Sequence, residues 1–155
     1  MTRRSLVCVL ALVLYGCAPS PPPPLTQVEV QDFVRQYVAA TNAADASRMM
    51  GLIHRDQAVS SIAYGKIDRG WDAIRAATDE SITASARVKV TIGTIDVTAL
   101  GTDAALAVAS MSVSSGTPVQ VGRTLTLIDA SGALTIVVKR TPEGLRLIHE
   151  HYSIR

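Results

Sequence analysis

Residues 135–153 read TIVVKRTPEGLRLIHEHYS, and this stretch decides the fold. Residues 134–140 and 145–154 are rich in branched side chains, and the turn sequence Glu143-Gly144 lies between them. Two such runs joined by a short connection that contains glycine predict an antiparallel hairpin. The chain therefore ends in paired strands.

The same pattern extends upstream as far as Ala86. Val88, Val90 and Ile92 alternate with polar residues, and the apolar phase then slips by three residues across Gly93, which predicts a bulge. Further strands are predicted over 104–114 and 119–128, with turns at Ser115-Gly116 and Ser131-Gly132. This half of the chain therefore reads as an antiparallel meander.

The half that precedes Ala86 is predicted to be mainly helical. From Thr26 to Asn42 apolar residues recur every three or four positions, which predicts an amphipathic helix. Asp45 can cap a second helix that ends at Leu52, and a third follows Gly70, from Trp71 to about Ala86. Between these helices, residues 58–68 read as a hairpin that turns at Gly65-Lys66. The fold class is α+β, with N-terminal helices packed on a curved antiparallel β-sheet.

The N-terminal segment has the features of an export signal. Arg3 and Arg4 precede an apolar run over 6–15 that is too short to span a bilayer. The sequence Leu14-Tyr15-Gly16-Cys17 resembles the bacterial lipobox, which implies cleavage before Cys17 and a lipid on that cysteine. We expect a signal peptide over 1–16, a proline-rich tether over 17–25 and one domain over 26–155. An ordinary signal peptide cut nearby and a buried N-terminal helix are the alternatives.

Composition excludes several classes of function. The chain of 155 residues has 15 Lys and Arg against 13 Asp and Glu, and removal of Arg3 and Arg4 leaves 13 of each. Nucleic acid is therefore not expected as a partner. Cys8 and Cys17 are the only cysteines, so no disulfide is expected in the mature domain. The chain has no glycine-rich phosphate loop, nucleophile elbow or HExxH motif, and no cofactor is expected.

Several segments together resemble the SnoaL-like branch of the NTF2-like superfamily. They are AATNAAD at 39–45, GWDAI at 70–74, TIVVKR at 135–140 and EGLRLIHEHYS at 143–153. The closing His-x-His-x-Ser is also similar to the end of the association domain of calcium/calmodulin-dependent protein kinase II. The resemblance implies a cone, in which a curved antiparallel sheet wraps around the first helix and encloses a pocket. It also implies that the outer face of the sheet forms homodimers.

The ketosteroid isomerases of this superfamily carry a tyrosine on the first helix, and Tyr37 matches it. Their two catalytic carboxyl groups would fall near Ser61 or Ile62 and near Ile136 or Val137, where this chain has none. An aliphatic side chain cannot transfer a proton. Tyr37 is therefore expected to form a wall of the pocket.

The last strand offers two faces. A period of two places His149, His151 and Ser153 with Leu145 and Leu147, opposite Glu150 and Tyr152. Two histidines on one face could bind a metal if His54 or an aspartate joined them, but no spacing indicates a third ligand, and no metal is expected. The resemblance to the kinase association domain implies that Tyr152 points into the pocket and that the histidines point outward. There they would fix the strand register of the sheet or contribute to a dimer interface. Glu150 would then act as an acid or pair with Arg140, Lys139 or Arg123.

These observations favour an exported domain, held by the lipid on Cys17 to a bacterial membrane and facing the periplasm or the cell exterior. Its expected partner is a small apolar molecule bound in the cone. The expected ligand-binding residues are Tyr37, His54, Tyr64, Trp71, Glu150 and Tyr152. The alternatives are an acid/base enzyme in the same pocket and a non-catalytic homodimerisation module.

Overall fold

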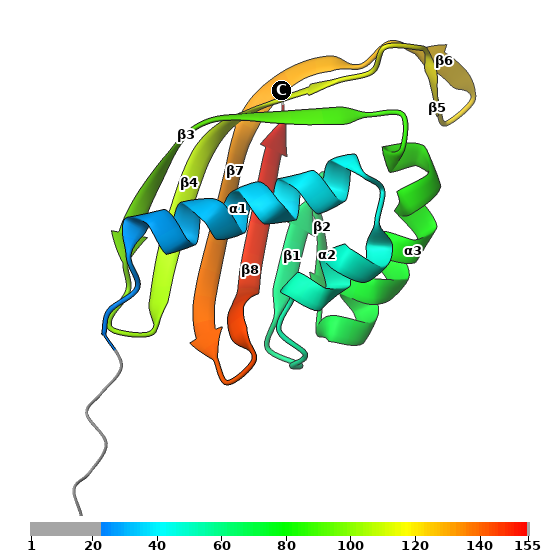
Figure 1. Ribbon diagram of the computed structural model, residues 1–155. Helices are drawn as coiled ribbons and strands as arrows, with labels where there is room; N and C mark the ends of the chain where they lie inside the picture. The colour runs from blue at the N-terminus through cyan, green and yellow to red at the C-terminus, as the bar shows by residue number, and fades with distance from the viewer. Residues whose placement is uncertain (1–22, 155) are drawn as a thin grey trace, which may run out of the picture.

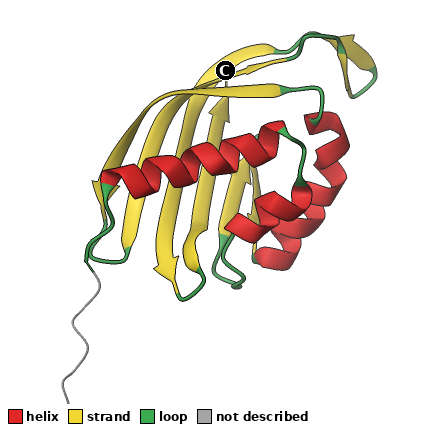
Figure 2. Cartoon of the chain, viewed as in Figure 1, coloured by secondary structure: helices red, strands yellow, loops and turns green. Residues whose placement is uncertain are grey.

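The computed structural model describes residues 23–154 (Figure 1). The predicted signal peptide, Cys17 and most of the predicted tether lie outside these residues. Three helices, α1 (Gln27–Asn42), α2 (Ala46–Leu52) and α3 (Trp71–Ser85), cover the concave face of a six-stranded sheet (Figure 2). In the described part of the chain, no helix has the length and apolar character needed to cross a membrane.

The sheet has the strand order β2-β1-β8-β7-β4-β3. Its strands are β1 (Ser60–Ala63), β2 (Lys66–Arg69), β3 (Lys89–Ala99), β4 (Ala104–Ser114), β7 (Asp129–Thr141) and β8 (Gly144–Ile154). All neighbouring strands are antiparallel except β1 and β8, which are parallel. The sequence predicted a sheet that is antiparallel throughout, and the parallel pairing of β1 with β8 corrects that prediction. Ile53 bridges Leu147 after α2, and the chain therefore enters the sheet alongside β8 and in its direction.

A single strand over 119–128 was a wrong prediction. The chain forms two short strands there, β5 (Val119–Val121) and β6 (Thr124–Thr126), which pair with each other and not with the main sheet. Figure 1 shows this hairpin extending beyond the sheet on the side of α3. The turn predicted at Ser131-Gly132 is also wrong, because both residues lie inside β7 and pair with β4.

The three helices agree with the sequence, and their caps explain the boundaries. Thr26 and Glu29 form a capping box at the start of α1, and the Asp45 side chain caps α2. One face of α1 is buried against the sheet, through Val30, Phe33, Val34, Tyr37, Val38 and Ala40. Each large apolar side chain buried in this way contributes about 1.5–3 kcal/mol. This burial holds the helix across the concave face.

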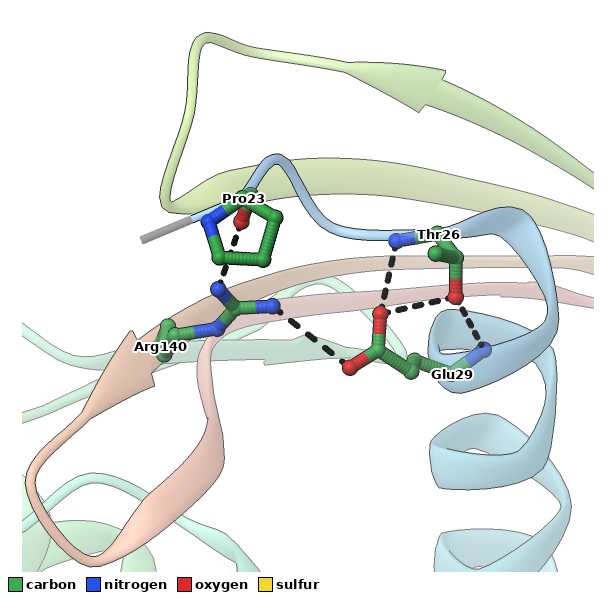
Figure 3. A network of polar contacts seen from close by, with 4 residues as sticks. All are labelled: Pro23, Thr26, Glu29 and Arg140. Carbon is green, nitrogen blue, oxygen red and sulfur yellow. Dashed lines mark hydrogen bonds and ion pairs between the residues drawn. The ribbon is translucent and has the colours of Figure 1, made fainter. Parts of the chain in front are cut away.

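An arginine from β7 fastens the start of the domain (Figure 3). The Arg140 guanidinium donates to the Pro23 carbonyl at 2.6 Å and lies 3.5 Å from a Glu29 carboxylate oxygen. Hydrogen bonds from Thr26 lower the pKa of Glu29, and the positive charge of Arg140 acts in the same direction. Leu25 packs against the core. The last residues of the predicted tether therefore lie on the domain.

Two irregularities set which side chains face inward. In β3 the register shifts between Ile92 and Ile95, which confirms the bulge predicted at Gly93. In β8 it shifts at Ile148, because Val137 pairs with His149 while Val138 pairs with Leu147. Leu147 and Glu150 are consequently both buried, although they are three residues apart. The strict period of two that grouped Leu147 with His149 was therefore wrong.

The turn between β1 and β2 lies at Tyr64-Gly65, one residue earlier than predicted. Both residues have positive φ angles, 52° and 78°. A two-residue hairpin turn of type I′ requires this conformation at both positions. Gly65 adopts it without strain.

Gly132 provides a test of the packing inside β7. A Cβ atom at this position would collide with the backbone carbonyl of Ser153, whereas a Cβ at Gly51 in α2 would meet nothing within 4 Å. We expect Gly132→Ala to lower the free energy of unfolding by about 1–3 kcal/mol, the usual cost of overpacking. Gly51→Ala, the matched control, should leave it unchanged or raise it by up to about 1 kcal/mol. Urea unfolding measures both, and equal midpoints would contradict the predicted clash.

Candidate functional site

A buried carboxylate joins three secondary-structure elements beneath α1. The Tyr37 hydroxyl, from α1, donates to Glu150 Oε2 at 2.7 Å. The Tyr152 hydroxyl donates to the same oxygen at 2.8 Å, and the Ser61 hydroxyl, from β1, donates to Oε1 at 2.7 Å. We call these four residues the Glu150 cluster.

The strand register explains why the cluster assembles. Ser61 on β1 is the direct partner of Glu150 on β8, and Ile136 on β7 is its partner on the other side. In the next row, Tyr152 lies between Ala63 and Leu134. Side chains two residues apart share a face of a strand, so Tyr152 and Glu150 both point toward α1.

Glu150 is only 4% exposed. No Lys or Arg within residues 23–154 forms an ion pair with it, and its partners are three neutral hydroxyls. The pairing expected with Arg140, Lys139 or Arg123 is therefore wrong. Arg140 binds Pro23 and Glu29, and Lys139 lies 3.9 Å from Asp103. Arg123 belongs to the separate β5–β6 hairpin, where residue 123 precedes β6.

The two tyrosines of the cluster keep their protons. Burial raises the pKa of the Tyr37 phenol well above its usual value, and the nearby Glu150 carboxylate raises it further. The same two causes, in the same order, raise the pKa of Tyr152. Near neutral pH both phenols are consequently hydrogen-bond donors to Glu150 and cannot act as bases.

Beyond Tyr152 the concave face becomes apolar and partly exposed. The row across the sheet at this level contains Ile92, Met111, Gly132 and Ile154. Val90, Ile92, Ile128 and Ile154 are each only partly buried against the core, whereas Met111 is fully buried. We call this region, where β8 ends, the open end of the cone.

The structure brings together only part of the predicted ligand-binding set. Tyr37, Glu150 and Tyr152 are in contact, and Tyr64 lies near enough to Tyr152 to influence its pKa. Tyr64 itself is at the tip of the β1–β2 turn and is 82% exposed. His54 precedes β1, where its backbone N–H donates to the Leu147 carbonyl. It therefore lies at the opposite end of β1 from Tyr64.

Trp71 also lies at that opposite end, where α3 begins. Its backbone N–H donates to the Asp56 carbonyl, and the Arg55 guanidinium lies 4.8 Å from the centre of its ring. These residues line an open cleft of about 340 Å³, together with Gln57 and Asp72. His54 and Trp71 are therefore separated from Tyr64 by the length of β1.

The other face of β8 carries the histidines. His149 Nδ1 and the Ser60 hydroxyl lie 2.8 Å apart in a hydrogen bond that joins β8 to β1. His151 and Ser153 are exposed on the same face. Among residues 23–154, no three His, Cys, Asp or Glu side chains gather in an arrangement that could hold a metal ion.

Sequence reasoning missed Ser61 as a member of the cluster. That position was considered only as the place where related isomerases carry a carboxyl group. The parallel pairing of β1 with β8 makes Ser61 the partner of Glu150, and no local pattern announces a parallel pairing between segments 89 residues apart.

The cluster predicts how stability depends on alkaline pH. Tyr37→Phe removes one donor from Glu150 and should lower the free energy of unfolding at pH 7 by about 1–3 kcal/mol. The folded state raises the pKa of Tyr37, so its contribution is complete below the unfolded value of about 10 and is lost as the pH rises toward the folded value. The difference between wild type and variant should therefore narrow above about pH 10.

Urea unfolding at pH 7, 9 and 10.5, followed by circular dichroism, measures this difference. Tyr64→Phe is the control, because the exposed Tyr64 hydroxyl should contribute little. A difference that stays constant or widens up to pH 10.5 would contradict the interpretation.

Comparison with solved structures shows the same architecture in other bacterial proteins. An NTF2-like superfamily protein from Salmonella enterica superposes with a TM-score of 0.68 at 19% identity, over 81% of this chain and 88% of that one. A protein with a cystatin-like fold from Caulobacter vibrioides gives 0.71 at 22%, over 83% and 88%. A Streptomyces avermitilis protein that carries the name of a dehydratase of the NTF2-like family gives 0.69 at 20%, over 81% and 93%.

At these identities the likeness establishes the fold alone. No protein of curated function matches the chain. The model of the SnoaL-like domain family, however, matches residues 30–155, which is most of the chain. The chain therefore belongs to the SnoaL-like domain family and has the NTF2-like fold.

Proposed function

We propose that this protein is an exported, lipid-anchored domain that binds a small apolar molecule at the open end of its cone. The observation that carries the proposal is the partly exposed apolar surface formed there by Val90, Ile92, Ile128 and Ile154. Apolar side chains on a concave face, above a few polar groups, are the usual lining of a small-molecule site. Tyr152 supplies the polar group at the base of this surface.

The chemistry of the cluster favours binding over catalysis. An acid/base reaction needs a group that exchanges a proton with the bound molecule. Tyr37 and Tyr152 hold their protons, because burial and the neighbouring carboxylate raise both pKa values. Glu150 lies beneath them with both oxygens accepting hydrogen bonds and with 4% of its surface exposed.

The outer face of the sheet supports a second function, homodimerisation. Its central side chains are small and uncharged, and they include Ser110, Ser112, Ala133, Thr135, Val137 and Ser153. The charged residues of this face lie at its margins. Lys89 and Asp96 are on the edge strand β3, and Asp129, Lys139 and Arg146 are near the ends of β7 and β8. Depletion of charge at the centre of a patch is typical of an interface.

The binding site is tested by substitution at the open end. We expect Ile154→Asn to weaken binding of naphthalene by about 1–2 kcal/mol, because a polar side chain would enter an apolar surface. Val108→Asn is the matched control on the outer face, where Val108 is 37% exposed. Equilibrium dialysis against the mature chain in lipid nanodiscs, with protein-free discs as background, measures binding. Equal binding by both variants, or none by wild type, would contradict the proposed site.

Lipid anchoring is tested at Cys17. Protein purified from the host's membranes should begin at Cys17 and carry the mass of its acyl chains, which hold a protein in the bilayer when more than one is present. Cys17→Ser should remove that mass, whereas Cys8→Ser should not, because Cys8 lies in the predicted signal peptide. Intact-mass spectrometry distinguishes them, and a wild-type chain without acyl mass would refute the anchor.

Sedimentation of the same wild-type preparation tests the proposed homodimer and should give two chains per particle.

A further inference from the structure

The Glu150 cluster has three hydroxyl protons, and all three point at one carboxylate. A hydroxyl carries a single proton and two lone pairs. Tyr37 and Tyr152 both donate to Glu150 Oε2, and Ser61 donates to Oε1. A ligand that approaches one of these hydroxyl oxygens therefore meets its lone pairs and not its proton.

Tyr152 is the member that a ligand at the open end would meet. Tyr37 is 2% exposed and Ser61 lies deeper, in the row of Glu150, whereas Tyr152 is partly exposed. The row above Tyr152 contains Ile154 and Gly132, and the glycine has no side chain to cover the phenol. Within the Glu150 cluster, Tyr152 is consequently the residue nearest to the apolar surface of the open end.

The hydrogen bonds in the cluster prevent the Tyr152 hydroxyl from becoming the donor to a ligand. For the Tyr152 hydroxyl to donate to a ligand, it would have to release a buried carboxylate, and hydrogen bonds to carboxylates are about twice as strong as neutral ones. The high pKa values of both phenols keep the protons in place across the physiological range. In residues 23–154, no Lys or Arg forms an ion pair with Glu150, so no cation offsets the negative charge that would repel an anionic ligand.

We infer that the open end selects apolar molecules that end in a hydrogen-bond donor, such as a hydroxyl or an N–H group, with Tyr152 as the acceptor. Molecules that end in an ether, a carbonyl or a carboxylate are disfavoured. This inference rests on the proposed binding function and names the class of ligand that the site takes. Tyr152 is its specificity-determining residue.

Two probes with one ring system test the inference. 1-Naphthol donates a hydrogen bond, whereas 1-methoxynaphthalene has the same oxygen and can only accept. We expect wild-type protein to bind 1-naphthol about tenfold more tightly, which corresponds to about 1.4 kcal/mol. In Tyr152→Phe the ring remains and the acceptor is lost. The ratio of the two affinities should therefore fall to about one. Comparison of this ratio between wild type and variant cancels the effect of the extra methyl group of the ether.

Equilibrium dialysis against the mature chain in lipid nanodiscs measures each affinity, and protein-free discs give the background. Naphthalene, which has no polar group, reports binding to the apolar surface without the hydroxyl. Val108→Asn, on the outer face, is the control variant and should bind all three probes as wild type does. If none of the three probes binds, the proposed function fails. If naphthalene binds but the two oxygen-bearing probes bind equally well, or the ether binds more tightly, the inference fails and the binding function stands.

Discussion

The carboxylate of Glu150 is the constraint on which the concave face depends. Its removal from water costs several kcal/mol, which is recovered only if its oxygens are satisfied inside the protein. Three hydroxyl groups satisfy them, and they come from α1, from β1 and from β8 itself. Any shift of α1 along the sheet, or of β1 against β8, would leave a buried charge without partners. The cluster therefore fixes both alignments more strictly than apolar packing could, because apolar contacts tolerate small displacements.

The helices could be predicted from the sequence because local signals define them. Thr26 with Glu29, and Asp45, are caps that act within one turn, and the apolar period of α1 matches its buried face. The last two strands and the bulge at Gly93 were predicted for a similar reason. Strand 119–128 could not be predicted correctly, because apolar alternation indicates a strand without showing which strand it pairs with.

The candidate site was less predictable because it depends on long-range register. The sequence placed Glu150 and Tyr152 on the face opposite the histidines, which agrees with the contact to Tyr37. It could not place Leu147 correctly, since the bulge at Ile148 reverses the phase within the strand. His54 and Trp71 were grouped with Tyr64 on a coarse picture of the fold, and the direction of β1 separates them. Gly132 was read as a turn, although the close approach of Ser153 is what requires glycine there.

The bond between Arg140 and the Pro23 carbonyl has a mechanical consequence. Tension on the chain that precedes Pro23 would otherwise act on the first turn of α1, where a helix frays most easily. Arg140 diverts that force into β7, which is held on both sides by β4 and β8. A pull along a central strand loads many backbone hydrogen bonds at once, whereas a pull on a helix end breaks them one by one. A pull on the chain before Pro23 would thus be met by a central strand as well as by the end of a helix.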